Sequence, residues 1–574
     1  MHYRSKNLLL FFLIALAVLT INLENILAAL NHHYFLNDQD GYMHMVVASD
    51  FLKKQDWYQH FNARINAPLG SDTHGWTQVI SLLLISGTLV LDLIMPLSKA
   101  LYIWGFVLPM LCNAIAAYAM LWAIKSLNPT NFQKLFIIAA FLLNPFLSSL
   151  FVPLNVDYDF LLITLSIIYW GCLLRLIVNN KNIWAISVAI LAGIGLWTSI
   201  SFIIIVFIGL IFIAGLSVVQ NRMSIATLNV LLVVLCMMLA LAIRLEHRYF
   251  FTVAYDIVSI VHLTFFLLIL IGTNIYAVCN RESKKSVKII FILTLLVIIF
   301  FLMNYLFPGF YYGPYNQVSP YLLQFFFPVI SEFYSPFTID SAVALAVLCY
   351  FIIGVGFFYY RYLDNQPLEL PQILLLWAAI ATISFTIFMY RWNEFSSPLT
   401  ILLVSFFVAS CCNKKMSNYL RLAIVGAMVF MPSAILSLGN DFVPLAHLQC
   451  QQQFHKMIED NFLELPQFTH DKTLFVHSNY GPLILFYTHY SIVATNDHHN
   501  PEGVKDSFTF FKSDESAAKK IIAKRQIDLI LLCQAEHPVQ FDPNQSQWLQ
   551  PIVLPEKYPL WRLYRVVHHA KNFN

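Results

Sequence analysis

Residues 8–30 read LLLFFLIALAVLTINLENILAAL, and residues 37–42 just beyond them read NDQDGY. The first stretch is apolar over about 23 residues, and roughly 20 are enough to cross the hydrocarbon core of a bilayer. Arg4 and Lys6 precede it, as basic residues precede the apolar part of a signal peptide. The length of the run and the lack of a small-residue cleavage site favour an uncleaved first spanning helix with a cytoplasmic N-terminus.

The composition extends this interpretation to most of the 574-residue chain. Hydrophobic residues make up 59% and charged residues 11%, against roughly 45–50% and 25% in soluble proteins. So few charges cannot cover so much apolar surface, which excludes both a string of soluble domains and a disordered chain. The net charge of +3 is too small to indicate binding to nucleic acid. Membrane lipids are therefore the expected surroundings.

Apolar segments of about spanning length recur along the chain. Thirteen are clear, at 8–30, 100–124, 133–152, 160–178, 183–199, 201–219, 225–243, 257–279, 287–306, 341–360, 371–389, 398–412 and 420–438. With the first helix running outward, the loops assigned to the cytoplasm are richer in Lys and Arg than the opposite loops, as the positive-inside rule requires.

The run 76–96 is ambiguous. If it also spanned, every later loop would change sides and the bias of basic residues would invert. It also carries Asp92, which a lipid-exposed span tolerates poorly. We therefore expect a helix in the outer interface, or a re-entrant one.

An odd number of spans places the more polar C-terminal part outside. We predict a membrane domain over 1–439, with long outer loops at 31–99 and 307–340, and an extracytoplasmic α/β domain over 440–574. Strand-like runs in this second domain (Thr473–His477, Ser491–Thr495, Ile527–Cys533) alternate with helix-like ones (Gly481–Thr488, Asp514–Gln526). The nine cysteines show no spacing typical of a metal site or a disulfide framework, so we interpret them as small hydrophobic residues in the membrane.

Three acidic clusters fall on the outer side under this topology. They centre on Asp40, on Asp157 with Asp159, and on Glu332. Carboxylates are hard oxygen ligands that suit Mg²⁺ or Mn²⁺, and one such ion would neutralise a phosphate leaving group. The alternative for each cluster is a solvated loop or a helix cap, but two Asp-rich clusters at membrane boundaries on one side favour a site.

Basic residues on the same side are candidates to bind a donor phosphate. Arg391 and Arg248 are the two choices, since a guanidinium can bind phosphate bidentately; the alternative is an interfacial anchor that extends toward water. His74 is a candidate on the acceptor side or part of an interfacial turn. The pair His498-His499 is interpreted as a surface loop, because adjacent histidines rarely share a metal.

The order of these features resembles the GT-C superfamily of polyprenyl-phosphate-dependent glycosyltransferases, and above all the catalytic subunit of oligosaccharyltransferase in its single-chain bacterial form. Asp40-Gly41-Tyr42, Asp157-Tyr158-Asp159 and Val329-Ile330-Ser331-Glu332 match the three acidic motifs of that family. The resemblance implies thirteen spans, Asp40 as metal ligand or base, Glu332 in a catalytic role, a metal shell completed by Asp157, Asp159 and Glu332, and Arg391 on the donor phosphate.

One motif departs from the family. Its soluble domain carries Trp-Trp-Asp-Tyr-Gly, which contacts the Ser or Thr of the acceptor sequon. The matching stretch here is His477-Ser478-Asn479-Tyr480-Gly481, so both indoles and the carboxylate are replaced. Asn479 and Tyr480 remain as acceptor-side candidates, while the loss of the indoles argues against a peptide acceptor.

We therefore expect a multi-pass enzyme of the bacterial inner membrane that transfers a sugar or oligosaccharide from a polyprenyl-linked donor to an extracytoplasmic acceptor, either lipid or glycan. The alternatives are a true oligosaccharyltransferase that acts on protein Asn, a flippase or transporter for lipid-linked sugars, and a polysaccharide polymerase or ligase. A transporter would be expected to have paired broken helices and ionisable residues near the midplane, and few such residues occur in the sequence.

Overall fold

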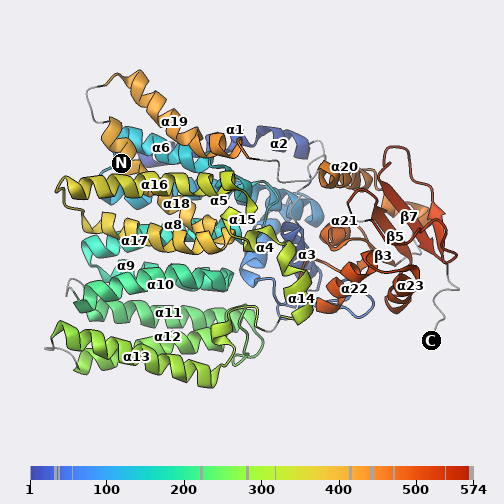
Figure 1. The fold of residues 1–574 in the computed structure, drawn as a ribbon, viewed down its shortest axis with the longest axis horizontal. Helices are drawn as coiled ribbons and strands as arrows, with labels where there is room; N and C mark the ends of the chain where they lie inside the picture. Colours follow the sequence, from blue (N-terminus) through green and yellow to red (C-terminus); the bar gives the residue numbers. More distant parts are fainter. Residues whose placement is uncertain are drawn as a thin grey trace.

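The computed structural model describes residues 2–567, except 31–34, 36–38, 55, 220–223, 280–283, 317, 413–415, 440–444, 469–471 and 537. Long helices lie side by side in one bundle, and a smaller domain with a β-sheet sits at one end of it (Figure 1). The division of the chain near residue 440 stays a prediction.

Ten helices in the described part of the chain are long and apolar enough to cross a membrane. They are α5 (Leu97–Ile124), α8 (Asp159–Asn179), α10 (Ile203–Ala214, with the short turns at its two ends), α11 (Ile225–Glu246), α12 (Ile260–Cys279), α13 (Lys285–Leu306), α16 (Ser341–Leu363), α17 (Leu370–Phe388), α18 (Asn393–Cys412) and α19 (Asn418–Leu436).

Two bent pairs raise the number of spans to as many as twelve. One pair is α1 (His2–Ile21) and α2 (Leu23–Leu30), bent by 65°, and the other is α6 (Asn131–Leu142) with α7 (Pro145–Ser148), bent by 50°. Pro145 has no N–H to continue the helical ladder, which explains the second break. The remaining predicted segment is α9 (Asn182–Thr198), whose 17 residues are slightly short for a span.

The ambiguous run 76–96 contains the helix α4 (Gln78–Asp92). Thr77 caps its N-terminus, since the Thr77 side chain accepts a hydrogen bond from Val79 N. Its 15 residues fall short of the roughly 20 that a span takes. α4 packs against α5, α9 and α3 (Asp40–Lys54). This length agrees with a helix that does not span, and its place in the interface stays a prediction.

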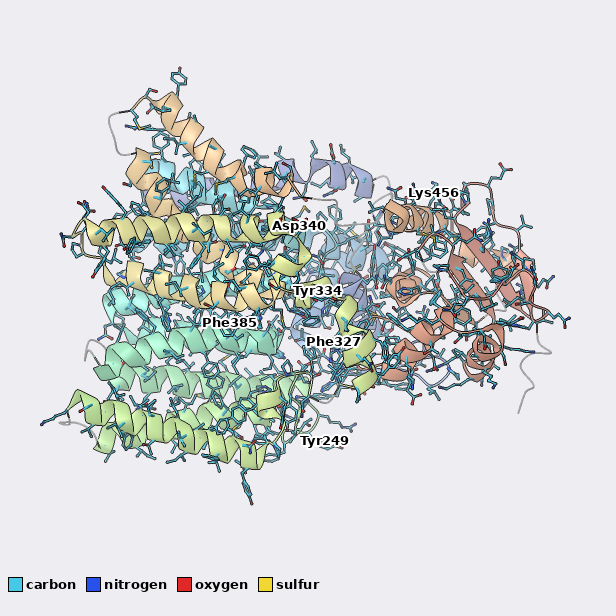
Figure 2. All side chains as sticks on the ribbon, in the orientation of Figure 1. Tyr249, Phe327, Tyr334, Asp340, Phe385 and Lys456 are labelled. Atoms are coloured by element: carbon cyan, nitrogen blue, oxygen red, sulfur yellow. A yellow bond between two sulfur atoms is a disulfide. The ribbon has the colours of Figure 1, made fainter. Side chains whose placement is uncertain are left out.

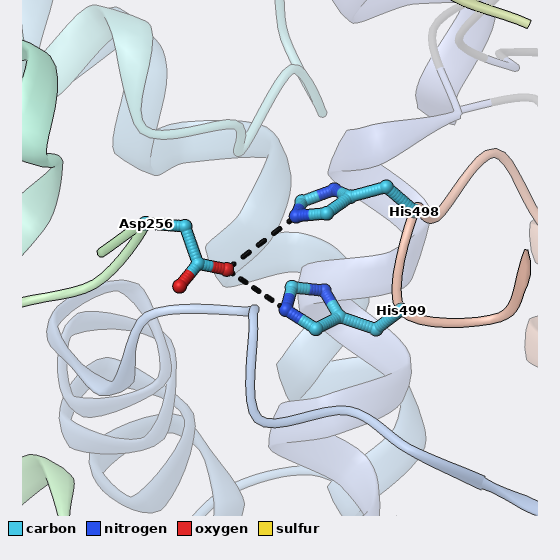
Figure 3. A group of neighbouring side chains, drawn as sticks. All are labelled: Asp256, His498 and His499. Carbon is cyan, nitrogen blue, oxygen red and sulfur yellow. Dashed lines mark hydrogen bonds and ion pairs between the residues drawn. The ribbon is translucent and has the colours of Figure 1, made fainter. Parts of the chain in front are cut away.

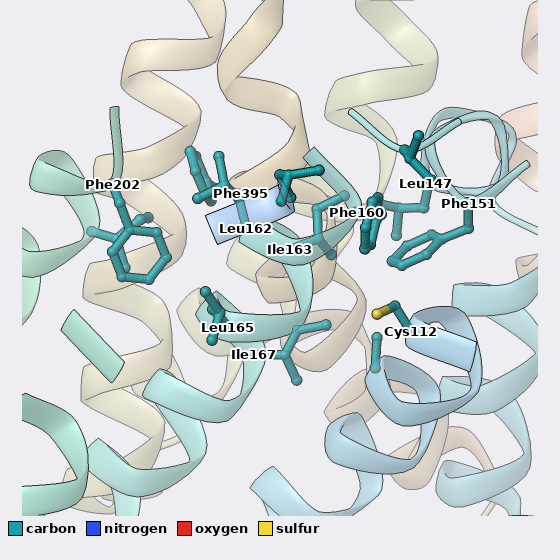
Figure 4. Close-up of a cluster of buried hydrophobic side chains, with 14 of the residues drawn as sticks. Cys112, Leu147, Phe151, Phe160, Leu162, Ile163, Leu165, Ile167, Phe202 and Phe395 are labelled. Carbon is teal, nitrogen blue, oxygen red and sulfur yellow. The ribbon is translucent and has the colours of Figure 1, made fainter. Parts of the chain in front are cut away.

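The core of the bundle lies around α8. In the span-forming windows of α8, α5 and α18, 78%, 72% and 72% of the residues are buried, against 11% in α13 and 17% in α19. Phe160 and Leu162 of α8 pack near Cys112 of α5 and Phe395 of α18 in this core (Figure 4). Most of the apolar side chains of α13 and α19 are therefore exposed on the outside of the bundle, where they would face lipid. Figure 2 shows the side chains that project from the outer helices of the bundle.

The C-terminal domain holds a five-stranded mixed sheet in the order β4-β3-β5-β7-β6. The predicted strands are confirmed as β3 (Thr473–Phe475), β4 (Ser491–Ile492) and β5 (Leu529–Cys533), which pair in parallel, and the predicted helices as α21 (Gly481–Tyr487) and α23 (Glu515–Lys524). Sequence reasoning missed the antiparallel strands β6 (Leu549–Ile552) and β7 (Trp561–Val566) and the helices α20 (Leu445–Glu459) and α22 (Pro501–Phe511).

The segment predicted to form the first outer loop, between α2 and α4, contacts this domain. The loop contains α3 and the short antiparallel strands β1 (Phe61–Asn62) and β2 (Ser71–Asp72). Arg64 donates hydrogen bonds to the backbone carbonyls of Leu485, Thr488 and Tyr490. Backbone bonds from Ala67 N to Ile492 O and from Ile492 N to Arg64 O continue the contact along β4. The loop thus extends the sheet at its edge.

The interpretation of all cysteines as small apolar residues was wrong for two of them. Cys450 of α20 and Cys533 of β5 form a disulfide across 83 residues of the C-terminal domain. The free cysteines of the described residues are Cys112, Cys172, Cys236, Cys349, Cys411 and Cys412, most of them buried in the bundle, as expected. Two lone cysteines give no spacing signal, so only the packing of α20 on the sheet brings them together.

Candidate active site

A cavity of about 140 Å³ lies where the outer loops meet the C-terminal domain. Asp40, Glu332 and Arg391 all line it, although they are far apart in the sequence. The remaining polar and small lining residues are Gly75, Trp76, Tyr158, Asn496, Asp497 and His498, and the aromatic and apolar ones are Tyr315, Phe326, Phe327, Ile330 and Phe333. The structure therefore brings together one candidate from each of three predicted groups.

The helix α3 supplies two polar side chains to this region. Asp40 is its first residue, and His44 lies one turn later on the same face. The His44 side chain is fully buried, with Nε2 3.7 Å from Asp157 Oδ1 and its ring edge-on to Trp76 at 5.0 Å. Sequence reasoning missed His44; its spacing of four residues from Asp40 was the signal.

Arg391 lies in the short 3₁₀ turn Tyr390–Trp392 that joins α17 to α18. Its side chain is only 13% exposed, so it does not extend toward water as an interfacial anchor would. Nη1 lies 3.4 Å from Glu332 Oε1 and Nη2 lies 4.0 Å from Asp159 Oδ1. The Tyr158 hydroxyl accepts a hydrogen bond from Nη2, and the guanidinium also faces the Tyr158 ring at 5.4 Å.

Burial raises the pKa of Tyr158 well above its ordinary value, and the carboxylates of Asp157 and Asp159 raise it further, although Arg391 acts in the opposite direction. The phenol therefore stays protonated at neutral pH. A neutral hydroxyl beside the guanidinium can donate as well as accept a hydrogen bond.

A further buried carboxyl group stands beside this set. Glu394, in the first turn of α18, is 4% exposed and lies against Asp159. Sequence reasoning named only Arg391 from the stretch Arg391-Trp392-Asn393-Glu394. The three-residue separation from Arg391 brings the two side chains to one face of a helix, which was the available signal.

The four carboxylates predicted as metal ligands have the oxygen ligands that a divalent cation prefers, but their oxygens do not converge on one position. Asp159 Oδ1 is buried without a hydrogen-bond partner among the described residues, and its nearest positive charge is Arg391 Nη2 at 4.0 Å. However, no three of the ligand oxygens of Asp40, Asp157, Asp159 and Glu332 lie within 4.8 Å of one another. These side chains would have to rotate before their oxygens could surround one ion. In the structure, Arg391 provides the positive charge beside Asp159 and Glu332.

The other predicted residues lie outside the cavity lining. His74 Nε2 is 2.9 Å from His247 Nδ1, and burial together with the neighbouring His60, His247 and His499 lowers the pKa of His74 to about 3, so its ring is neutral. Arg248 is exposed, and its carbonyl accepts a hydrogen bond from Arg244.

The two acceptor-side candidates of the C-terminal domain separate. Asn479 Oδ1 accepts a hydrogen bond from Asn496 Nδ2 at 3.0 Å, and Asn496 lines the cavity. Tyr480 is instead 3% exposed in the domain core, where its ring packs between Phe454 and Trp561. Asn479 is therefore next to the cavity, and Tyr480 supports the domain.

The interpretation of His498-His499 as a surface loop was wrong. Both side chains are half-buried and turn toward Asp256, in the loop between α11 and α12 (Figure 3). Burial alone would raise the pKa of Asp256, but hydrogen bonds from the two histidines hold it well below its usual range. Burial opposes a charged His499, yet Asp256 and Asp497 raise its pKa to about 10. Sequence reasoning did not name Asp256.

No family model and no curated protein matches the chain in sequence. Solved structures do match in fold. The archaeal oligosaccharyltransferase AglB from Archaeoglobus fulgidus, in complex with an inhibitory peptide and a dolichol-phosphate, superposes with a TM-score of 0.68 at 14% identity, over 92% of this chain and 70% of that chain. Its apo form gives 0.64 at 15% identity over 92% and 69%, and its complex with Zn and sulfate gives 0.57 at 14% over 91% and 67%.

The likeness covers both the helical bundle and the C-terminal domain. The chain therefore has the fold of a GT-C membrane glycosyltransferase. Within that class it resembles the oligosaccharyltransferase AglB.

Proposed function

We propose that this protein is an integral-membrane glycosyltransferase that moves a sugar or oligosaccharide from a polyprenyl-(pyro)phosphate donor to a lipid or glycan acceptor outside the cytoplasm. The observation that carries the proposal is the single cavity in which Asp40, Glu332 and Arg391 meet from three distant segments. The matching AglB structure contains a dolichol-phosphate, which supports a lipid-linked donor for this fold.

Arg391 would bind the donor phosphate. Its planar guanidinium can make two parallel hydrogen bonds to phosphate oxygens, and its low exposure in the cavity wall strengthens their attraction. As the sugar–phosphate bond breaks, negative charge grows on the leaving oxygen, and the guanidinium stabilises it. Tyr158, hydrogen-bonded to Arg391, would hold the guanidinium in orientation.

Asp40 would accept the proton of the acceptor hydroxyl. A carboxylate at the cavity wall can remove this proton while the oxygen attacks the anomeric carbon. A single displacement from the side opposite the phosphate inverts the anomeric configuration. His44, one turn along α3 and close to Asp157, would hold Asp157 in position relative to Asp40.

A divalent ion, Mg²⁺ or Mn²⁺, belongs to the proposal. Asp40, Asp157, Asp159 and Glu332 would hold it, since the oxygen ligands suit these ions and Asp159 Oδ1 has no hydrogen-bond partner among the residues that the structure describes. When bound, it would supply additional positive charge against the leaving phosphate.

The residues of the C-terminal domain at the sequon-motif positions bear on the class of acceptor. His477 packs against Phe508 and Phe511, Ser478 is buried, and Asn479 is bound to Asn496. No indole stands at these positions to wall a pocket for a sequon hydroxyl. A lipid or glycan acceptor is therefore favoured over the Asn side chain of a protein, which remains the second candidate because AglB has the same fold.

We also propose that the protein lies in a bacterial inner membrane, with the N-terminus in the cytoplasm and the C-terminal domain in the periplasm. The Cys450–Cys533 disulfide supports this orientation, because such bonds persist in oxidising compartments.

The experiment that tests the function is a transfer assay with purified protein and a polyprenyl-pyrophosphate-linked oligosaccharide. Membrane lipids and glycans serve as acceptors, and transfer is read by mass spectrometry. Product formation that requires Asp40 and Arg391 would support the proposal. Movement of intact donor across a vesicle membrane without bond cleavage would favour a flippase and refute it.

A further inference from the structure

A second group of polar side chains lies beside the proposed catalytic carboxylates. Asp256 comes from the loop between α11 and α12, whereas His498 and His499 come from the C-terminal domain between β4 and α22. Figure 3 shows both imidazoles turned toward one carboxylate oxygen. Asp256 Oδ2 lies 3.4 Å from His498 Nε2 and 2.9 Å from His499 Nε2. Two segments more than 200 residues apart are thus brought into contact by three side chains of types that can bind a metal ion.

The spacing and chemistry of the three ligand atoms suit a transition metal. A tetrahedral zinc ion with bonds of about 2.0–2.1 Å places its ligand atoms roughly 3.3 Å apart, and the two measured distances lie on either side of that value. All three atoms fall within 4.8 Å of one another. Two imidazoles with one carboxylate favour Zn²⁺ over Mg²⁺, which prefers oxygen ligands alone.

The ring of His499 is held in the orientation that a metal ligand needs. Its Nδ1 lies 3.0 Å from Asp497 Oδ1, and Trp76 Nε1 donates to Asp497 Oδ2 at 3.1 Å. The Asp497 side chain is only 6% exposed. A carboxylate that accepts the Nδ1 proton leaves Nε2 for a metal, which is the usual outer arrangement around metal-bound histidine.

The first outer loop closes against the same ring. Gly75 lies so near His499 that a Cβ at this position would come within 2.2 Å of the ring carbon Cε1. His498 in turn lines the cavity with Asp40 and Glu332. The three side chains therefore lie where the first outer loop, the α11–α12 loop and the C-terminal domain meet.

We propose that Asp256, His498 and His499 bind one ion of the zinc class, which clamps the C-terminal domain to the outer loops beside the cavity. Water would complete the coordination, as is common where the protein gives three ligands. Without the metal, His499 faces Asp497 through Nδ1 and Asp256 through Nε2; the ion would take the place of a proton on Nε2, which is released to water, while the Nδ1–H stays on Asp497. This site is distinct from the carboxylates assigned to Mg²⁺ or Mn²⁺.

The test measures bound metal in the full-length protein purified in detergent. After incubation with Zn²⁺ and removal of unbound ion, plasma mass spectrometry should find about one zinc per chain. Asp256→Asn and His498→Ala should each lower this content at least tenfold. Two controls should keep it: His489→Ala, whose histidine pairs with Glu464, and Asp40→Ala, which alters the catalytic set. Equal zinc in Asp256→Asn and the unaltered protein would overturn the proposal.

A second measurement needs no variant. Co²⁺ bound by two imidazoles and a carboxylate in tetrahedral geometry gives visible absorption that is far more intense than that of octahedral aqueous Co²⁺ and lies at longer wavelength. Titration of the unaltered protein should produce this absorption and saturate at about one ion per chain. Its absence would overturn the proposal even if the variants fail to fold. Neither readout depends on sugar transfer, so the metal site and the proposed function can fail separately.

Discussion

At the scale of single residues, the site depends on Arg391. Two carboxylates and a phenol surround its guanidinium, and its side chain is 13% exposed. A donor phosphate would compete with Glu332 and Asp159 for the same N–H groups. Lysine could supply the charge but not the planar pair of donors.

Substitution of Arg391 tests its role on the donor. Arg391→Lys should lower kcat about 10²-fold and Arg391→Ala about 10³-fold, because a preorganised donor to the leaving group is lost. Initial rates with saturating lipid-linked sugar measure the effect. Arg361→Ala, at the exposed end of α16, is the matched control and should stay within twofold. Normal rates for Arg391→Ala would remove Arg391 from the mechanism.

The acidic residues give a second prediction. Asp40→Ala, Asp157→Ala and Glu332→Ala should each abolish transfer while the amount of protein in the membrane stays near normal, because the outer-loop carboxylates act on charge rather than packing. Immunoblots and the transfer assay measure both. Asp38, outside the described residues, should tolerate Ala, since the resemblance assigns the role to Asp40. Full activity of Asp40→Ala would refute the mechanism.

At the scale of elements, the first outer loop joins the two domains. Arg64 is part-buried and donates to three carbonyls around α21 and β4. Hydrogen bonds from a charged donor contribute about 1.5–3 kcal/mol each and are not additive. The loop therefore fixes where Asn496, Asp497 and His498 stand relative to Asp40.

Arg64→Ala should loosen this contact. We expect a loss of about 3 kcal/mol in the free energy that holds the C-terminal domain against the loop, with several carbonyls left without a donor. Limited proteolysis and Tm in detergent should both register it. Arg562→Ala is the control, because Arg562 donates hydrogen bonds to carbonyls next to it in the chain, at Pro559 and Trp561. Equal protease resistance of Arg64→Ala and the parent would contradict this account.

The direction of the spans is a further prediction at this scale. Reporter fusions after residues 125, 180, 222, 283, 365 and 415 should report the cytoplasm, and fusions at 55, 315 and 450 the outside, because the loops rich in Lys and Arg stay inside. A cytoplasmic signal at residue 156 would break the thirteen-span arrangement and separate Asp157 from Asp40. The same fusions show whether α4 crosses the membrane.

At the scale of the whole molecule, the C-terminal domain covers the outer end of the bundle and supplies one wall of the cavity through Asn496, Asp497 and His498. In the AglB structure of the same fold, a peptide is bound together with the lipid phosphate. The replacement of two indoles by His477 and Ser478 changes the region that would contact such a peptide.

We expect no Asn-x-Ser/Thr glycosylation. Without indole walls, water competes for the acceptor hydroxyl, and discrimination by a hydrogen bond weakens. Purified protein is incubated with lipid-linked sugar and a fluorescent sequon peptide, with a lipid or glycan acceptor in a parallel reaction. Efficient transfer to the peptide that disappears when its Ser or Thr becomes Ala would establish an oligosaccharyltransferase and overturn the prediction.

The sequence by itself determined the membrane character, the position of the described helices of spanning length and the strands β3, β4 and β5. The physical reason is local: apolar runs of about 20 residues need lipid, and short apolar runs such as those of β3 and β5 fit strands buried on both faces of a sheet. It also pointed to Asp40, Glu332 and Arg391, because each stands at the outer end of a segment and matches a motif of the resembled family.

Only the tertiary structure decided which of these residues meet. His44 and Glu394 became visible through burial next to Asp157 and Asp159. The packing of α20 on the sheet brings Cys450 to Cys533. The docking of the C-terminal domain on the bundle brings His498 and His499 to Asp256. No local pattern marks such pairs, because their partners lie 83 or more than 200 residues away and their proximity depends on how whole elements pack.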